Sequence, residues 1–144
     1  VVIAIIGILA AVVLASLNDA RDGGQDASIK QSIGNARSQA ELSYNSSGFS
    51  YNSVCADTNV QQLMQAAADN RAETVTVVYN TAADSATQVA CANTDAGYAI
   101  AAPLNIPNGA GTVQMWCIDS TGAVGTTSPG TIDGSTGTPD VTCG

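Results

Sequence analysis

Four cysteines carry the clearest chemistry in this sequence. They are Cys55, Cys91, Cys117 and Cys143, at intervals of 36, 26 and 26 residues. Protein zinc sites use close ligand pairs such as C-x-x-C, commonly with histidine, and this sequence contains neither. An even number of cysteines instead predicts two disulfides, for which three pairings exist. We favour Cys55–Cys91 with Cys117–Cys143, because each of these bridges would close one irregular stretch.

The acidic residues offer little support for catalysis. The sequence has no histidine, and Glu41 and Glu73 are isolated. Asp119, Asp133 and Asp140 lie in stretches rich in glycine, where aspartate is usually a turn residue. A calcium site would need about six oxygen ligands, and these spacings match no compact calcium-binding loop. We therefore expect no enzyme activity, no cofactor and no resident metal.

Hydroxyl side chains are concentrated in the stretch Thr126–Thr138, which also contains Pro129. Such a composition occurs in O-glycosylated segments, and the alternative is a plain solvated loop. The candidate O-glycosylation positions are Thr126, Thr127, Ser128 and Thr131. The triplet Asn45-Ser46-Ser47 matches an N-glycosylation sequon, but such triplets are common by chance.

The first seventeen residues, Val1–Leu17, form an almost unbroken apolar run that ends at the polar stretch Asn18–Asp22. As a helix the run would be about 25 Å long, slightly less than the hydrocarbon core of a bilayer. Such a segment either sits in lipid or packs against copies of itself. An ordinary membrane anchor stays open as an interpretation. A secretory signal peptide is disfavoured, because no basic region precedes the run.

Length and charge limit the remaining classes. The 144 residues suffice for one domain plus its leading helix, and we divide them into an apolar segment with its polar neck, residues 1–24, and a head, residues 25–144. The net charge of −8 repels phosphate backbones, so direct binding of nucleic acid is not expected.

Hydrophobic periodicity predicts a single long helix from Val1 to about Asn45, loosened or interrupted at Gly23-Gly24. Its first half is apolar on all sides. Its second half is amphipathic, with one apolar stripe that would lie across a globular head. The stripe consists of Ile29, Ile33, Ala36, Ala40 and Tyr44.

The shorter elements follow from capping and β-branched patterns. A capping box at Thr58–Gln61 predicts a second helix that ends at about Asp69. Strands are expected at Thr74–Tyr79, Gly97–Ala102 (stopped by Pro103), Thr112–Ile118 and Ala123–Thr127, with Cys91 in a polar loop. The predicted fold class is α+β, with the long N-terminal helix packed on a small antiparallel sheet and a C-terminal loop closed by a disulfide. The expected core of the head is Ile29, Ile33, Leu63, Val77, Ile100 and Trp116.

The segment Val1–Val12, VVIAIIGILAAV, resembles the N-terminal helix of bacterial type IV pilins and of type II secretion pseudopilins, Gly7 included. The later arrangement is similar too: an amphipathic continuation of the helix, a small antiparallel sheet, then the stretch Trp116–Gly122 and a cysteine near the end. In that family a methylated Phe and a Glu that pairs with a neighbour's N-terminus lie upstream of the matched segment. The family's helix-breaking Pro has no counterpart at Leu14–Ser16, so we expect flexibility at Gly23-Gly24 instead.

The resemblance implies a structural subunit that polymerises into a type IV pilus-like filament for adhesion, motility or DNA uptake. The subunit would be stored in the cytoplasmic membrane and then assembled by an ATPase and a platform protein into an extracellular filament of identical chains. The residues expected to pack between subunits are Ile3, Ala4, Gly7, Ile8, Ala10, Ala11, Leu14 and Ala15. A pseudopilin of a type II secretion system and a membrane-anchored extracellular binding module are the alternatives.

Overall fold

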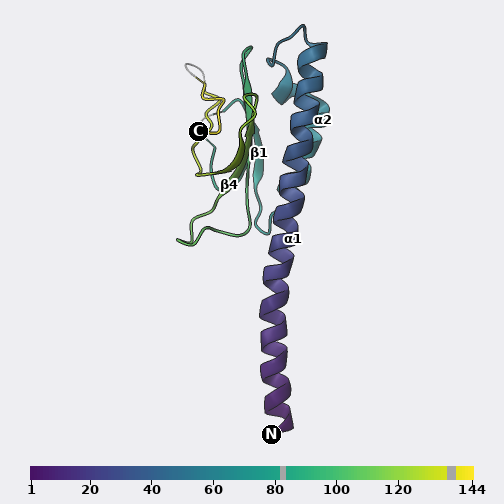
Figure 1. The fold of residues 1–144 in the computed structure, drawn as a ribbon, viewed down its shortest axis with the longest axis vertical. Helices are drawn as coiled ribbons and strands as arrows, with labels where there is room; N and C mark the ends of the chain where they lie inside the picture. Colours follow the sequence, from purple (N-terminus) through teal and green to yellow (C-terminus); the bar gives the residue numbers. More distant parts are fainter. Residues whose placement is uncertain (82–83, 136–138) are drawn as a thin grey trace.

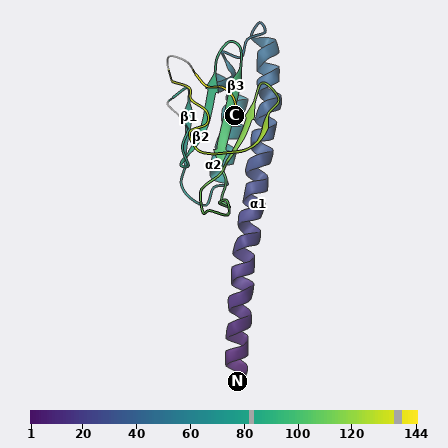
Figure 2. The same cartoon turned by 60° about the vertical axis from the view of Figure 1, so that its left-hand side comes forward.

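The computed structural model describes residues 1–81, 84–135 and 139–144, apart from the side chain of Ala15. A long helix, α1 (Val2–Ser46), runs the full length of the molecule. Its second half packs against a head, and its first half projects from that head as a bare stalk (Figures 1 and 2). The α+β class with a long N-terminal helix is therefore confirmed.

Helix α1 is continuous for 45 residues, about 68 Å at the usual rise per residue. It passes through Gly23 and Gly24 without a break, so the predicted interruption is wrong. Two glycines cost about 1 kcal/mol each relative to alanine, which is small beside the intrahelical hydrogen bonds and the packing of the following turns. The apolar stripe of the second half is confirmed, because Ile29 and Ile33 are completely buried.

A short 3₁₀ turn, η1 (Val54–Ala56), leads into the second helix, α2 (Thr58–Asp69). The helix begins where predicted, but its cap differs. Asp57, not Thr58, is the N-cap, and its Oδ1 atom accepts hydrogen bonds from the backbone N–H groups of Asn59 (2.8 Å) and Val60 (3.2 Å). Aspartate is among the best N-cap residues because its carboxylate satisfies free N–H groups of the first turn.

The sheet has five strands in sequence order. Strand β1 runs parallel to β2 and all other neighbours are antiparallel, so the sheet is mixed and the prediction of a purely antiparallel one is wrong. Cys91 lies in a strand, not in the predicted polar loop. The strands are β1 (Thr76–Tyr79), β2 (Gln88–Asn93), β3 (Tyr98–Pro103), β4 (Met115–Asp119) and β5 (Val124–Thr127).

The two faces of the sheet are covered differently (Figure 1). Helices α1 and α2 cover one face, over a core that includes Ile29, Ile33 and Ile100. Leu63, Val77 and Trp116, which were also expected in this core, pack against its edge and are partly buried. The C-terminal segment covers the other face, where Ile132 packs among small side chains. That second cluster consists of Ala90, Ala99, Ala101, Met115, Cys117 and Ile132.

Candidate functional site

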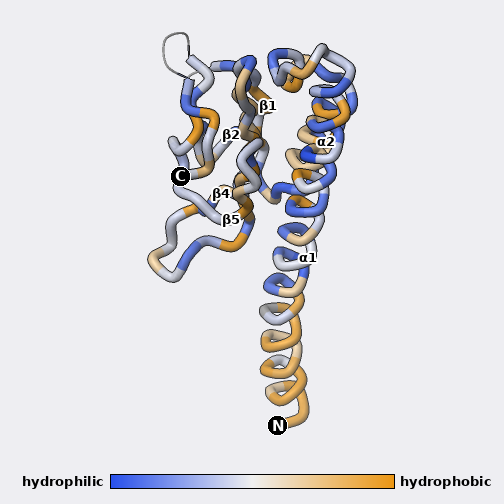
Figure 3. The backbone as a smooth tube through the Cα atoms, turned by 45° about the horizontal axis from the view of Figure 1, so that its top comes forward, coloured by the Kyte–Doolittle hydropathy of each residue, from blue (hydrophilic) through white to orange (hydrophobic). Residues whose placement is uncertain are grey.

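The apolar half of α1 is uncovered in the single chain. Every described side chain from Val1 to Leu17 is exposed, including Val2 (69 %), Ile8 (66 %) and Leu17 (62 %). Figure 3 shows the same segment as a stretch of mostly hydrophobic residues below a head of mixed hydropathy. Burial of a large aliphatic side chain is worth about 1.5–3 kcal/mol. A segment with so many of them is therefore a surface that needs another apolar environment.

The residues predicted to pack between subunits all lie on this stalk. Ala4, Gly7 and Ala11 share one face of the helix, because they are three and four positions apart. Apart from the neighbouring residues and the adjacent backbone of α1, no described atom lies within 4 Å of the position that a Cβ atom would take at Gly7. The exposed members of the predicted set are Ile3, Ala4, Gly7, Ile8, Ala10, Ala11 and Leu14, and the side chain of Ala15 lies outside the described residues.

By length and composition, α1 contains a stretch that is able to cross a membrane. None of that stretch is buried within the head. The same property suits a membrane anchor, a signal segment and a helix that packs among copies of itself.

The stalk joins the head at a buried carboxylate. Asp26 is only 5 % exposed, and its two oxygens accept hydrogen bonds from the backbone N–H groups of Asn105 (2.6 Å) and Ile106 (3.1 Å). Hydrogen bonds to a charged group are worth more than neutral ones. Asp26 therefore ties the chain between β3 and β4 to the point where α1 enters the head.

A buried guanidinium holds the same chain segment from the other side. The side chain of Arg71 is 4 % exposed, and its Nη1 atom donates to the carbonyl oxygen of Leu104 (2.6 Å) and to Oδ1 of Asn105 (3.2 Å). Its Nη2 atom lies 3.5 Å from a carboxylate oxygen of Glu73. The sequence suggested that Glu73 is isolated, but Glu73 lies beside Arg71. The guanidinium of Arg71 is bound by groups of the head.

Glu41 is not isolated either. The hydroxyl groups of Tyr51 and Tyr98 donate to its two carboxylate oxygens, at 3.1 and 3.4 Å. Tyr98 is completely buried, and this burial, reinforced by the negative charge of Glu41, raises the pKa of Tyr98 well above its usual value. The cluster therefore keeps both phenols protonated and fixes α1 to β3, which is a structural role.

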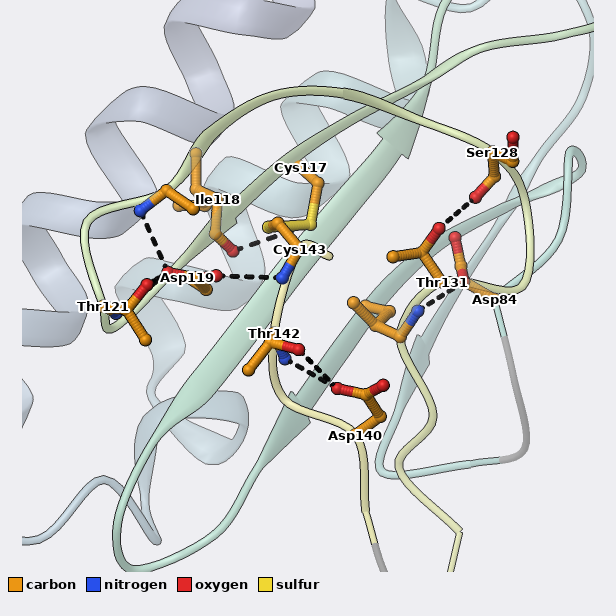
Figure 4. Close-up of a disulfide and its surroundings, with 12 residues drawn as sticks. Asp84, Cys117, Ile118, Asp119, Thr121, Ser128, Thr131, Asp140, Thr142 and Cys143 are labelled. Atoms are coloured by element: carbon orange, nitrogen blue, oxygen red, sulfur yellow. Dashed lines mark hydrogen bonds between the residues drawn. A yellow bond between two sulfur atoms is a disulfide. The ribbon is translucent and has the colours of Figure 1, made fainter.

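Both predicted disulfides are present. Cys55–Cys91 joins η1 to β2, with a Cα–Cα distance of 5.7 Å. Cys117–Cys143 joins β4 to the C-terminal segment, at 5.8 Å, and closes the predicted C-terminal loop (Figure 4). Disulfides persist in oxidising compartments, so they indicate that the head resides outside the cytoplasm.

Asp119 organises the turn beside the second disulfide (Figure 4). Its Oδ1 atom accepts hydrogen bonds from Thr121 and Ala123, and its Oδ2 atom accepts the N–H of Cys143 at 2.9 Å. Burial alone would raise the pKa of Asp119, but these hydrogen bonds outweigh it and the pKa is lowered. The carboxylate is thus a charged structural anchor, and the prediction of a turn residue is confirmed.

The other candidate acids form local turns as well. Asp133 accepts the N–H of Ser135, and Asp140 accepts the N–H and the hydroxyl of Thr142. Asp133 and Asp140 face each other only through a backbone bridge. Within residues 1–81, 84–135 and 139–144, no three His, Cys, Asp or Glu side chains come together as a metal site would require.

The four candidate hydroxyls differ in accessibility. Thr126 and Ser128 are exposed. Thr127 is half-buried and its hydroxyl oxygen is shielded from solvent, while the Thr131 hydroxyl donates to the carbonyl oxygen of Ser128 at 2.6 Å. Residues 136–138 lie outside the described part of the predicted stretch. Glycosylation itself stays a prediction, and Thr126 and Ser128 are its most accessible positions.

The carboxylates of Asp26, Glu41 and Asp119 accept hydrogen bonds that hold turns and join elements, and the apolar stalk is exposed. A scan of protein-family models, a search of curated proteins and a search of solved structures each gave no match for this chain.

Proposed function

We propose that this chain is the structural subunit of a helical, pilus-like filament in which the apolar half of α1 forms the core. Before assembly the same segment would sit in the cytoplasmic membrane. The acidic head would face an oxidising exterior, where both disulfides are stable. The chain would act by polymerising, with no catalytic step.

The observation that carries this proposal is the exposed stalk on a rigid, unbroken helix. Eleven large apolar side chains between Val1 and Leu17 are at least half exposed, and they point to all sides of α1. A helix that binds one partner needs one apolar stripe, whereas a helix that is apolar all round fits an environment that surrounds it. Lipid and a bundle of identical helices both provide such surroundings.

Small residues favour the bundle as the final state. Ala4, Gly7 and Ala11 lie on one face, and such residues allow helix backbones to approach closely. The resemblance of Val1–Val12 to pilin and pseudopilin helices supports the same conclusion. By that resemblance, an assembly ATPase and a platform protein would move the subunit from membrane to filament, for adhesion, motility or DNA uptake.

The test compares Ala11→Leu with Ala96→Leu. Ala96 is exposed in a loop of the head, so it receives the same substitution outside the proposed core. Overpacking costs about 1–3 kcal/mol per site, and helical symmetry repeats it in every subunit. We expect Ala11→Leu, and likewise Gly7→Leu, to abolish filaments seen by electron microscopy of the producing cells. Ala96→Leu should leave them intact.

The thermal melting of the detergent-extracted chain should be the same in all variants, because the head core lies outside the stalk. Normal filaments from Ala11→Leu and Gly7→Leu would contradict the filament proposal and favour a membrane-anchored extracellular module. Short structures confined to the cell envelope, in place of long surface filaments, would identify a secretion pseudopilus.

A further inference from the structure

The chain between β3 and β4, residues 104–114, forms a loop at the end of the head from which the stalk emerges (Figure 1). We call it the β3–β4 loop. The side chain of Ile106 in this loop lies beside α1, because its Cδ1 atom is 4.0 Å from the position that a Cβ atom would take at Gly23. The loop is thus beside α1 just above the polar neck.

The base of the β3–β4 loop is fixed to α1 and to the segment that follows α2. Asp26 accepts the N–H groups of Asn105 and Ile106, and Arg71 donates to the carbonyl oxygen of Leu104. The Asn105 side chain also accepts the N–H of Ala72, at 2.8 Å. These contacts, from α1 and from the segment after α2, set the height of the loop along α1. The loop must therefore follow the stalk wherever the stalk is embedded.

The surface of the loop carries no charge. From Pro103 to Ile118 the sequence contains no Asp, Glu, Lys or Arg, although the whole chain has a net charge of −8. Ile106 is 47 % exposed, and Pro107 and Ala110 are exposed beside it. Between them lie Asn108, Gly109 and Gly111, which are polar or small. An uncharged surface of this kind avoids repulsion from anionic lipids, which the acidic residues elsewhere would suffer.

The loop lies close to the outer edge of a bilayer's headgroup layer. When the apolar run occupies the hydrocarbon core, Leu17 marks its outer edge. Gly23 is six residues further, about 9 Å along the axis. The headgroup layer on each side of the core is about 5–8 Å thick. Transmembrane helices tilt by about 20° on average, which lowers one side of an attached head toward the membrane.

We propose that the β3–β4 loop rests in the headgroup layer of the membrane while α1 is embedded, with Ile106 as its apolar contact. This inference depends on the membrane-stored stage of the proposed function. The loop and the stalk then form two points of contact with the lipid. Together they fix the tilt and rotation of the head before assembly, which a single helix in lipid leaves free.

The experiment measures the depth of a single tryptophan in liposomes of phosphatidylcholine brominated near the headgroup end of its acyl chains. The native Trp116 is replaced by Phe in all samples, and the full chain then carries Val13→Trp, Ile106→Trp or Phe49→Trp. Phe49 is the matched control, because it is 71 % exposed at the opposite end of the head. A low ratio of protein to lipid keeps the chains apart.

We expect bromine to quench the fluorescence of Val13→Trp and Ile106→Trp and to leave Phe49→Trp unquenched. Quenching of Val13→Trp without quenching of Ile106→Trp would overturn the loop contact and leave the embedded stalk in place. Failure to quench Val13→Trp would refute the membrane-stored stage itself. Quenching of Ile106→Trp that appears only at high protein density would assign the loop to a second copy of the chain and overturn the lipid contact.

Discussion

Replacing Asp26 by alanine removes the carboxylate that ties the β3–β4 loop to α1. Two backbone N–H groups, those of Asn105 and Ile106, then lose their acceptors. Hydrogen bonds to charged groups contribute about 1.5–3 kcal/mol each. Water reaches this loop because Ile106 is 47 % exposed, so the loss should be partly offset. We therefore expect Asp26→Ala to lower the free energy of unfolding by about 2–4 kcal/mol.

The matched control is Asp22→Ala, one turn earlier on α1. In the described residues, Asp22 makes a loose ion pair with Arg21, at 3.8 Å. Replacing aspartate by alanine raises the helix propensity by the same amount at positions 22 and 26. Thermal unfolding of the full chain in detergent, followed by circular dichroism, should show a drop of about 8–16 °C for Asp26→Ala. The midpoint of Asp22→Ala should change little. Equal midpoints for the two variants would refute the assignment of Asp26 as the clamp of the loop.

Three further variants test other parts of the head. Gly134→Ala would place a Cβ atom 2.6 Å from the Cα atom of Asn80, so it should cost about 1–3 kcal/mol in urea unfolding, whereas Gly125→Ala has open space and should be nearly neutral. Replacing Cys117 and Cys143 by serine opens a loop of 26 residues and should lower the free energy of unfolding by about 3.5 kcal/mol; an unchanged value would show that the C-terminal segment holds without its bridge. Burial raises the pKa of the Asp84 carboxyl. The protonated carboxyl therefore stabilises the fold at a pH below its ordinary pKa, and this stabilisation is lost as the pH rises through the raised pKa. The thermal midpoint of Asp84→Asn should therefore be higher than that of the parent chain at pH 7, and the two midpoints should be equal at pH 3. A lower midpoint of the variant at pH 7 would contradict this.

Much of the fold was predictable because it depends on local patterns. The stripe from Ile29 to Ala40 located the packed half of α1. The disulfide pairing was predicted because each bridge closes one irregular stretch, and the structure contains that pairing. Strand β2 was missed because its sequence, QVACAN, has little β-branched or aromatic content, and its place is decided by the strands on both sides and by the disulfide at Cys91. Strand propensities calculated from the local sequence do not include such tertiary contacts.

Other departures also have local physical causes. Pro103 was expected to stop the strand, yet it is the last residue of β3. At that point β3 pairs only with β4, because its pairing with β2 ends at Ala101, so a missing N–H on the open side disrupts no ladder. Glu41 and Arg71 gained their partners from residues far along the chain, and no pattern around them indicated which. The apolar stalk is not covered by any part of the chain that the structure describes.

The two disulfides have a mechanical consequence for a chain that is pulled along α1. Each bridge bypasses the residues between its cysteines, so residues 55–91 and 117–143 are not drawn out even when the head loses its packing. At the extended length of a polypeptide, they withhold about 200 Å of chain from stretching. When such a head unfolds under tension, the chain therefore lengthens much less than it would without the bridges. The force is then carried by covalent bonds.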